Sequence, residues 1–313
     1  MNKVCRRIVV VCRTSSIRKA LLVGLVTPPL FLLANCGGAA SMSSSLSQPQ
    51  TPTTQPSDPS GSGASDPGPG GSSSGSSGSS SGGSNADVSN NGVPGNATVQ
   101  QAIQTLSGWE WCTAKLDGKP CASGLGNATS TLTQGQQTPS LSGASSEFTL
   151  GGKTQYSNAL WWKSFGQNST PTHFVYDVYF YMDHPNLPEA LEFDTNQSIN
   201  GTRYTWGTEC SYRHTGYWDI WNPETERWET TTVACPVVSA DTWHHLTWKV
   251  ERVNGQVHYI SVTLDGNVST VNTYYNPQQH YGGNDLNVAF QMDGDYRQDP
   301  YSVWLDNFSL SYW

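Results

Sequence analysis

Apolar and polar side chains alternate along successive segments of the second half of the chain. In segment 172–182, Tyr176, Val178 and Phe180 share one face if the chain is extended. Later segments are separated by Asn-Gly and Asp-Gly pairs, which are two-residue hairpin signals. Beyond the first 36 residues, no segment shows a helical period. The pattern predicts an all-β fold, a jelly roll in which two antiparallel sheets form a sandwich.

The predicted strands cover residues 147–150, 156–163, 172–182, 189–197, 202–210, 217–221, 243–252, 257–264, 268–275, 286–292 and 301–312. The Gly151-Gly152 pair is interpreted as a hairpin turn between the first two strands. Residues 101–106 are expected to form a short helix or an irregular lead-in.

The N-terminus has the pattern of an export signal. Six basic residues and no acidic residue occupy positions 1–19, and an apolar run follows from Ala20 to Ala34. The run is short and contains Pro28-Pro29, which argues against a membrane-spanning helix. It ends in Leu33-Ala34-Asn35-Cys36, which resembles a bacterial lipobox. The resemblance implies lipidation of Cys36 and a membrane-anchored lipoprotein; ordinary cleavage and an uncleaved anchor are the alternatives.

Composition divides the rest of the chain into two parts. Residues 37–96 are rich in Ser, Gly, Pro and Thr and are predicted to be a disordered linker, because they carry too few apolar side chains to form a core. All twelve Trp residues lie beyond position 99. The sequence therefore predicts a signal segment over 1–36, a linker over 37–96 and one folded domain over 97–313.

Charge and cysteine content limit the possible partners. The formal net charge is −8, and removal of the six basic residues of the leader makes the mature chain more acidic. Such a chain is not expected to bind nucleic acid. Four cysteines lie beyond the leader, and this even number indicates two disulfides in an exported domain. Sequence proximity favours Cys112–Cys121 and Cys210–Cys235; a zinc site lacks the usual ligand spacing.

The strand over 189–197 carries the main candidate site. Glu192, Asp194 and Asn196 fall on one face of the strand. The stretch resembles the Glu-x-Asp-x-Glu or Glu-x-Asp-x-x-Glu strand of the laminarinase-like (family 16) glycoside hydrolases. Glu192 and Asp194 match, whereas the final Glu is replaced by Asn196, or by Gln197 if a β-bulge adds a residue. The resemblance implies that Glu192 is the nucleophile and that Asp194 tunes it, with the acid/base missing.

Aromatic residues cluster directly after this strand. Trp206, Trp218 and Trp221 are expected to stack on sugar rings in a concave cleft, with His214 beside them as a hydrogen-bonding group. The run from Trp243-His244 through the two later hairpin turns resembles that of concanavalin A-like lectin and glucanase domains. This second resemblance implies the same jelly-roll fold.

Metal binding is weakly indicated. His244 and His245 are adjacent, so on a strand they point to opposite faces and do not share a metal. Asp293, Asp295 and Asp299 form an acidic turn that has some of the ligands for calcium but lacks a full calcium loop. We expect no required cofactor, with calcium as the only candidate.

Several functions remain open at this point. The leading hypothesis is an exported, lipid-anchored, monomeric lectin-like protein that binds polysaccharide. A glycoside hydrolase is the second, for which Glu189 and Glu209 are the nearest candidates for a second carboxyl group. A lyase using Tyr212 and His214, or a surface module for structure or adhesion, are further alternatives.

Overall fold

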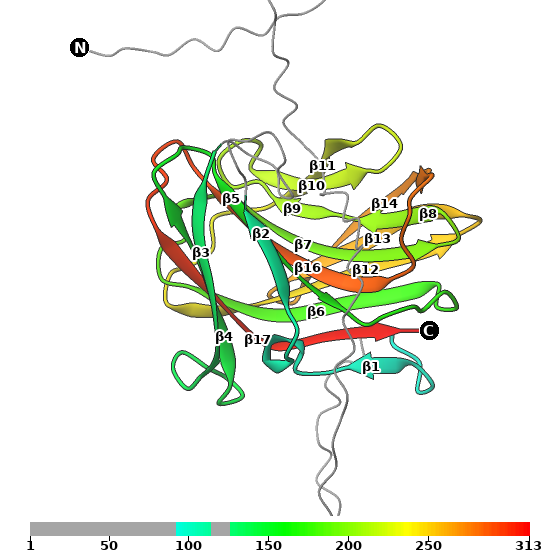
Figure 1. Ribbon diagram of the computed structural model, residues 1–313, viewed down its shortest axis with the longest axis horizontal. Coiled ribbons are helices and arrows are strands. Elements are labelled where there is room, and N and C mark those ends of the chain that lie inside the picture. Colours follow the sequence, from blue (N-terminus) through cyan, green and yellow to red (C-terminus); the bar gives the residue numbers. More distant parts are fainter. Residues whose placement is uncertain (1–91, 114–125) are drawn as a thin grey trace, which may run out of the picture. The chain divides into compact units, whose positions relative to one another are not determined.

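The computed structural model describes residues 92–113 and 126–313. The predicted signal segment, Cys36 and all but the end of the predicted linker lie outside these residues. The described part is all-β, with seventeen strands and one short 3-10 turn, η1 (Ile103–Thr105). The strands form two antiparallel sheets stacked as a sandwich (Figure 1), which confirms the predicted fold class. Among the described residues, no helix is long and apolar enough to cross a membrane.

Sheet 1 is built around the C-terminal strand. Its order is β14 (Asn267–Tyr275), β13 (Gln256–Leu264), β12 (Thr242–Val253), β6 (His173–Met182), β17 (Tyr301–Tyr312), β4 (Ser145–Gly152) and β3 (Ala128–Gln136), with β1 (Thr98–Gln100) also paired to β17.

Sheet 2 is built around the strand that carries Glu192. Its order is β11 (Arg227–Ala234), β10 (Tyr217–Asn222), β9 (Thr208–Cys210), β7 (Pro188–Ile199), β16 (Leu286–Gly294), β5 (Asn158–Ser164) and β2 (Glu110–Thr113), with β8 (Thr202–Trp206) beside β7 and β15 (Gln278–Gln279) beside β8.

Aromatic side chains from both sheets fill the space between them. Phe148 of β4 packs edge-on against Trp161 of β5 at 5.2 Å and against Phe290 of β16 at 5.1 Å, measured between ring centroids. These side chains are fully buried. Burial of each such ring contributes about 2–3 kcal/mol, so this layer fixes which face of each strand points outward.

The structure tests the predicted turns. Asn254-Gly255 and Asp265-Gly266 have positive φ angles at both positions and link β12 to β13 and β13 to β14, as predicted. The predicted hairpin at Gly151-Gly152 is wrong. Both glycines belong to β4, which pairs with β3 and β17 in sheet 1, whereas the strand that follows, β5, lies in sheet 2. The chain therefore crosses between sheets here.

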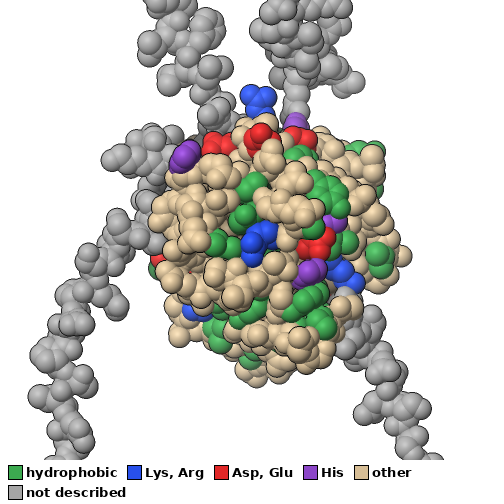
Figure 2. Space-filling view, turned by 90° about the vertical axis from the view of Figure 1, so that its right-hand side faces the viewer, with side chains coloured by type: hydrophobic (Ala, Val, Ile, Leu, Met, Phe, Trp, Pro, Cys, Tyr) green, Lys and Arg blue, Asp and Glu red, His purple; other side chains and the backbone are tan. Residues whose placement is uncertain are grey.

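Two polar strands, β3 and β11, were not predicted from the sequence. β3 and β11 alternate only between exposed and half-buried side chains, because each lies at the edge of its sheet and contributes little to the core. On the side of the molecule that Figure 2 shows, backbone and side chains that are neither hydrophobic nor charged cover most of the surface, with smaller groups of hydrophobic and charged side chains among them.

Candidate active site

Carboxyl groups line up across the outer face of sheet 2. Glu192 on β7 is directly opposite Glu209 on β9, and Glu209 is directly opposite Asp219 on β10. On the other side of Glu192, Gln291 on β16 continues the row. The alternation of β7 places Leu191 and Phe193 in the core, so this row faces outward. Four adjacent strands thus present three carboxyl groups and an amide in one line.

A second acidic side chain joins Glu192 from β16. The carboxyl groups of Glu192 and Asp293 hydrogen-bond to each other. The Gln291 amide donates to Oε1 of Glu192 and also to Oδ1 of Asp293, at 3.1 Å. Burial, followed by the nearby charges of Asp293, Asp194 and Glu209, raises the pKa of Glu192 well above its ordinary value. Glu192 therefore keeps its proton to higher pH than an exposed glutamate does.

The pKa of Asp293 is raised less. Burial raises it to about 7, while hydrogen bonds from Asn158, Gln291 and Glu192 oppose the rise. Asp293 remains half-buried at the surface, whereas Glu192 is 3% exposed beneath it. The pair is a carboxyl dyad in which Glu192 is the better proton holder and Asp293 the better anion.

Asp194 lies one step along β7 from Glu192 on the same face. Its Oδ1 accepts the backbone N–H of Thr208 at 3.0 Å. Burial raises the pKa of Asp194 to about 7, against the Thr208 hydrogen bond and the charge of Arg203, which lower it. Asp194 is thus held in place by the first residue of β9 and supplies a second buried charge near Glu192.

Glu209 faces the row from β9 and is half-buried. Burial and the charges of Asp293, Asp219 and Asp194 raise the pKa of Glu209 well above its ordinary value. Burial also raises the pKa of Asp219, although hydrogen bonds from Thr230 and Thr215 and the charge of His214 oppose it. The predicted site residue His214 therefore lies at the edge of the acidic row, exposed to solvent.

The position after Asp194 in the family pattern is Asn196. β7 and β16 remain in register from Leu191 to Gln197, so no bulge shifts the pattern to Gln197. The Asn196 amide donates to Asn287 at 3.1 Å and accepts from Arg203 at 3.0 Å. Gln197 points to the core side, where its amide donates to backbone carbonyls of the loop 168–171 at 3.0 Å. Asn196 belongs to the acidic face and Gln197 does not.

The predicted tryptophans separate into two groups. Trp206 and Trp218 lie in the core between the sheets, so neither contributes to the acidic face. Trp221 shares the outer face of β10 with Asp219, but it is 4% exposed and packs against Trp228 at 5.3 Å.

A different tryptophan reaches the acidic face. Trp162 of β5 is half-buried and separated from Asp194 of β7 only by the small residue Ala289 of β16. The adjacent Trp161 is fully buried in the core. The alternation of the Trp161-Trp162 pair was visible in the sequence, but the neighbouring strand was not.

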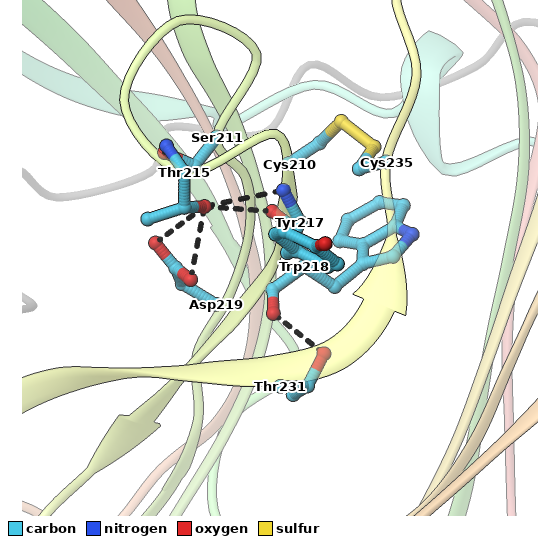
Figure 3. Close-up of a disulfide and its surroundings, with 8 residues drawn as sticks. All are labelled: Cys210, Ser211, Thr215, Tyr217, Trp218, Asp219, Thr231 and Cys235. Carbon is cyan, nitrogen blue, oxygen red and sulfur yellow. Dashed lines mark hydrogen bonds between the residues drawn. A yellow bond between two sulfur atoms is a disulfide. The ribbon is translucent and has the colours of Figure 1, made fainter.

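A disulfide closes the end of the row. Cys210 and Cys235 are bonded, with Cα atoms 5.6 Å apart, which confirms this predicted pair (Figure 3). Cys210 follows Glu209 directly, and Thr231 donates to the Trp218 carbonyl at 2.7 Å beside it. Cys112 is also disulfide-bonded, and its predicted partner Cys121 lies outside the described residues. The Cys210–Cys235 bond holds the β9 end of the site to the chain after β11.

The predicted metal ligands have other partners. His244 bonds to Asp265 at 2.7 Å and His245 to Asp177 at 3.0 Å, so the two histidines diverge as predicted. Asp295 accepts the backbone N–H groups of its own turn, while Asp299 is exposed. Within the described residues, no three His, Cys, Asp or Glu side chains are grouped to hold a metal ion.

Comparisons with known proteins give only distant likenesses. No protein-family model matches the chain, and no curated protein matches it. One similar solved structure is a carbohydrate-binding module of the β-sandwich superfamily (11% identity, TM-score 0.35). The match covers 66% of this chain and just over half (57%) of that one.

Two further solved structures match at a similar level. One is an endo-β-1,4-glucuronan lyase from the fungus Trichoderma reesei (10% identity, TM-score 0.39, covering 64% of this chain and 94% of that one). The other is a carbohydrate esterase from a Shiga toxin-encoding bacteriophage (12% identity, TM-score 0.39, covering 69% and 99%). Likenesses at this level carry no argument about function. Fold and site together define a two-sheet β-sandwich with a carboxyl-lined outer face.

Proposed function

We propose that the protein is a glycoside hydrolase that binds a neutral polysaccharide on the outer face of sheet 2 and cleaves it with Glu192 and Glu209. One observation carries this proposal: the two carboxyl groups oppose each other on β7 and β9. Directly opposed residues have Cβ atoms about 4.5–5.5 Å apart. Retaining hydrolases need two carboxyl groups about 5–5.5 Å apart, a separation that two opposed Glu side chains on neighbouring strands can reach.

The hydrogen bonds favour one division of roles. Burial and, to a smaller extent, the hydrogen bond with Asp293 favour the protonated form of Glu192, so Glu192 donates its proton to the glycosidic oxygen as the C1–O bond breaks. The pKa of Glu209 is raised too, but Glu209 is half-buried whereas Glu192 is 3% exposed, so Glu209 is the group that ionises, attacks C1 as a carboxylate and forms a glycosyl ester. Glu192, now ionised, removes a proton from water, and the resulting hydroxide releases the sugar from Glu209. The resemblance to family 16 implies that Glu192 is the nucleophile. The assignment proposed here instead makes Glu192 the acid/base and Glu209 the nucleophile.

The substrate class follows from the charge of the face. The negative charge of the face lies on Asp194 and Asp293, whose pKa values are about 7, and on Glu209 in its ionised form, with Arg203 as a neighbouring cation. Polyanionic glycans are repelled by such a face, whereas neutral glycans accept and donate hydrogen bonds to it. Half-buried Trp162 supplies a ring on which the apolar face of a sugar can stack.

A disulfide-bonded fold is typical of proteins that mature outside the cytosol. Together with the basic and apolar leader, it supports export, and we propose that Cys36 carries a lipid anchor. The protein would then act as a monomer on polymers outside the cytosol.

The test is incubation of the full chain with β-glucans, xylans and galactans, with reducing ends measured over time. We expect product from at least one neutral polymer, and a loss of about 10²–10⁴-fold in Glu192→Gln and in Glu209→Gln. Glu226→Gln, an exposed carboxyl in the turn between β10 and β11, is the matched control and should retain activity. Equal activity in all three variants would disprove the assignment.

A lectin-like protein without hydrolysis is the second candidate. It is favoured by the low exposure of Glu192 and by the Asn196–Arg203–Asn287 network, which replaces the acid of the family pattern with amides. Retention on a neutral polymer with no product from the wild type would select this function.

A further inference from the structure

Three aromatic residues stand in one row on the outer face of sheet 1, on the opposite side of the sandwich from the acidic face. Trp243 of β12 is directly opposite Tyr181 of β6, and Tyr181 is directly opposite Trp304 of β17. Their ring centroids lie 5.6 Å and 5.5 Å apart. The side chains before and after Tyr181, Phe180 and Met182, are buried in the core. The three rings therefore point outward, and we call them the aromatic row.

The rings are only partly covered. All three are half-buried although they lie near the middle of a seven-strand path. Trp304 stands at 84° to Tyr181, so the two form a corner rather than a flat stack. The Tyr181 hydroxyl donates to Asp241 at 2.8 Å, which fixes the ring in place. A corner of two fixed rings can receive the apolar face of one sugar residue.

A groove whose walls carry both hydroxyl and apolar groups, among them Pro300, begins beside this corner. It has a volume of about 340 Å³, and its walls include Ser302, Thr149, Thr131 and Asp183. Ser302 and Thr149 are directly opposite each other. They lie two residues along β17 and β4 from the Trp304–Glu147 pair, and therefore on the same face. Thr149 and Thr131 bond through their hydroxyls at 2.6 Å, and Ser302 donates to Glu147 at 2.8 Å.

We propose that the aromatic row and this groove form a second glycan-binding site, which takes a segment of neutral polysaccharide. Aromatic faces bind the C–H surface of a sugar, and hydroxyl and carboxylate groups beside them bind its hydroxyls. Beside the rings lie the stacked Tyr179–His245 pair, at the next outer-face positions of β6 and β12, and the hydroxyl and carboxylate groups of the groove. The carboxylates of Glu147, Asp183 and Asp241 select against polyanions. The site holds the polymer on sheet 1 independently of cleavage on sheet 2.

The first experiment measures retention of the full chain on insoluble β-1,3-glucan, cellulose and xylan by depletion from solution. The test variant is Trp243→Ala/Trp304→Ala. The control is Tyr274→Ala, which removes an exposed ring that stacks on His258 elsewhere on sheet 1, at 3.8 Å. We expect about tenfold weaker retention of the test variant on the polymer that retains the wild type, with the control unchanged. Unchanged retention of the test variant, or no retention of the wild type on any polymer, would overturn the proposal.

A second measurement covers a test variant that does not fold. Hydroxyl-radical footprinting of the wild type with and without the polymer should show protection of Trp243, Tyr181 and Trp304, but not of Tyr274. Equal oxidation in both samples would overturn the proposal. Failure of the proposed hydrolase is separable, because Glu192→Gln/Glu209→Gln should lose product release and keep retention. If that variant instead loses retention while the aromatic-row variant keeps it, the polymer binds only on sheet 2.

Discussion

Glu192 and Asp293 lie on neighbouring strands of sheet 2, and their carboxyl groups hydrogen-bond to each other. Burial is the largest cause of the raised pKa of both groups; the bond adds to the rise for Glu192 and opposes it for Asp293. Two carboxyl groups at this distance do not ionise together readily, so they share a proton. Gln291 donates to both and holds them in position. The dyad therefore adds to burial in favouring the protonated form of Glu192.

The assignment of roles predicts how leaving groups respond. A nitrophenyl glycoside has a leaving group that needs no protonation, so Glu192→Gln should lose less than about tenfold in kcat/KM on it, while losing about 10²–10⁴-fold in kcat/KM on polysaccharide. Its kcat on the nitrophenyl glycoside should fall further, because Glu192 also activates the water that hydrolyses the glycosyl ester. Glu209→Gln should lose activity on both substrates, because the glycosyl ester cannot form. Values of kcat/KM, which report formation of the ester, test this on the two substrates. The reverse pattern would return the nucleophile role to Glu192.

The buried carboxyl groups predict an unusual dependence of stability on pH. The pKa of Asp194 is about 7 in the folded protein and close to 3.8 when unfolded. Between these values the folded state binds more protons than the unfolded state, so the free energy of unfolding falls as pH rises from about 4 to about 7. Asp293 acts in the same direction.

Asp194→Asn removes one of these titrations and can still accept the Thr208 N–H. We expect it to exceed the wild type in stability at pH 8 by on the order of 1–3 kcal/mol, with a smaller difference at pH 5. Urea unfolding of both proteins at the two pH values measures this. Asp299→Asn, at an exposed position, should follow the wild type. If the free energy of unfolding changed with pH by the same amount in Asp194→Asn and in the wild type, titration of Asp194 would not be the cause of the pH dependence.

The sequence predicted the fold and one strand of the site. Period-two alternation on β7 placed Glu192, Asp194 and Asn196 on one face, because Leu191 and Phe193 had to enter the core. It could not place Asp293, which is about a hundred positions away and joins the site only through the β7–β16 pairing. Strand order in a sandwich depends on long-range pairing, which local patterns do not encode.

The aromatic residues show a second limit. Trp206 ends β8 and Thr208 begins β9, with Gly207 between them, yet the alternation continues from one strand to the next: Tyr204, Trp206 and Cys210 lie in the core, and Glu209 lies on the outer face. A Cβ atom at Gly207 would lie 2.8 Å from the Trp221 side chain, which explains the glycine. Large rings are at once the best core residues and the best sugar platforms, and only packing separates the two uses.

The Asp306 carboxylate is predicted to stabilise the fold through its hydrogen bonds. It is fully buried and accepts from Ser140 and Ser142 hydroxyls at 2.7 and 2.6 Å and from the Leu141 N–H at 2.6 Å. Burial acts to raise the pKa of Asp306, but hydrogen bonds from Ser142, Ser140 and Leu141 outweigh it and lower the pKa. Its stabilising effect is present above the ordinary pKa and is lost as pH falls through the lowered one.

Asp306→Asn replaces one acceptor oxygen by an N–H that faces other donors. We expect a loss of about 2–4 kcal/mol in the free energy of unfolding at pH 7, and a smaller loss near pH 3. Ser140→Ala removes one donor and should cost about 1 kcal/mol. Chemical unfolding at both pH values gives the comparison. A cost for Asp306→Asn below that of Ser140→Ala would contradict the central role of this carboxylate.

The Cys210–Cys235 disulfide predicts a coupling between stability and the acidic site. It joins residues 25 positions apart, a loop for which a disulfide contributes about 3 kcal/mol. Cys210→Ala/Cys235→Ala should lower the midpoint of thermal unfolding by about 6–12 °C. Because Cys210 follows Glu209 directly, the same variant should lose activity even at temperatures below its midpoint of thermal unfolding.

Cys112→Ala/Cys121→Ala is the matched control, which should lose stability yet keep activity, since Cys112 lies on β2 at the opposite edge of sheet 2. Equal activity of the two double variants would show that the disulfide does not position Glu209.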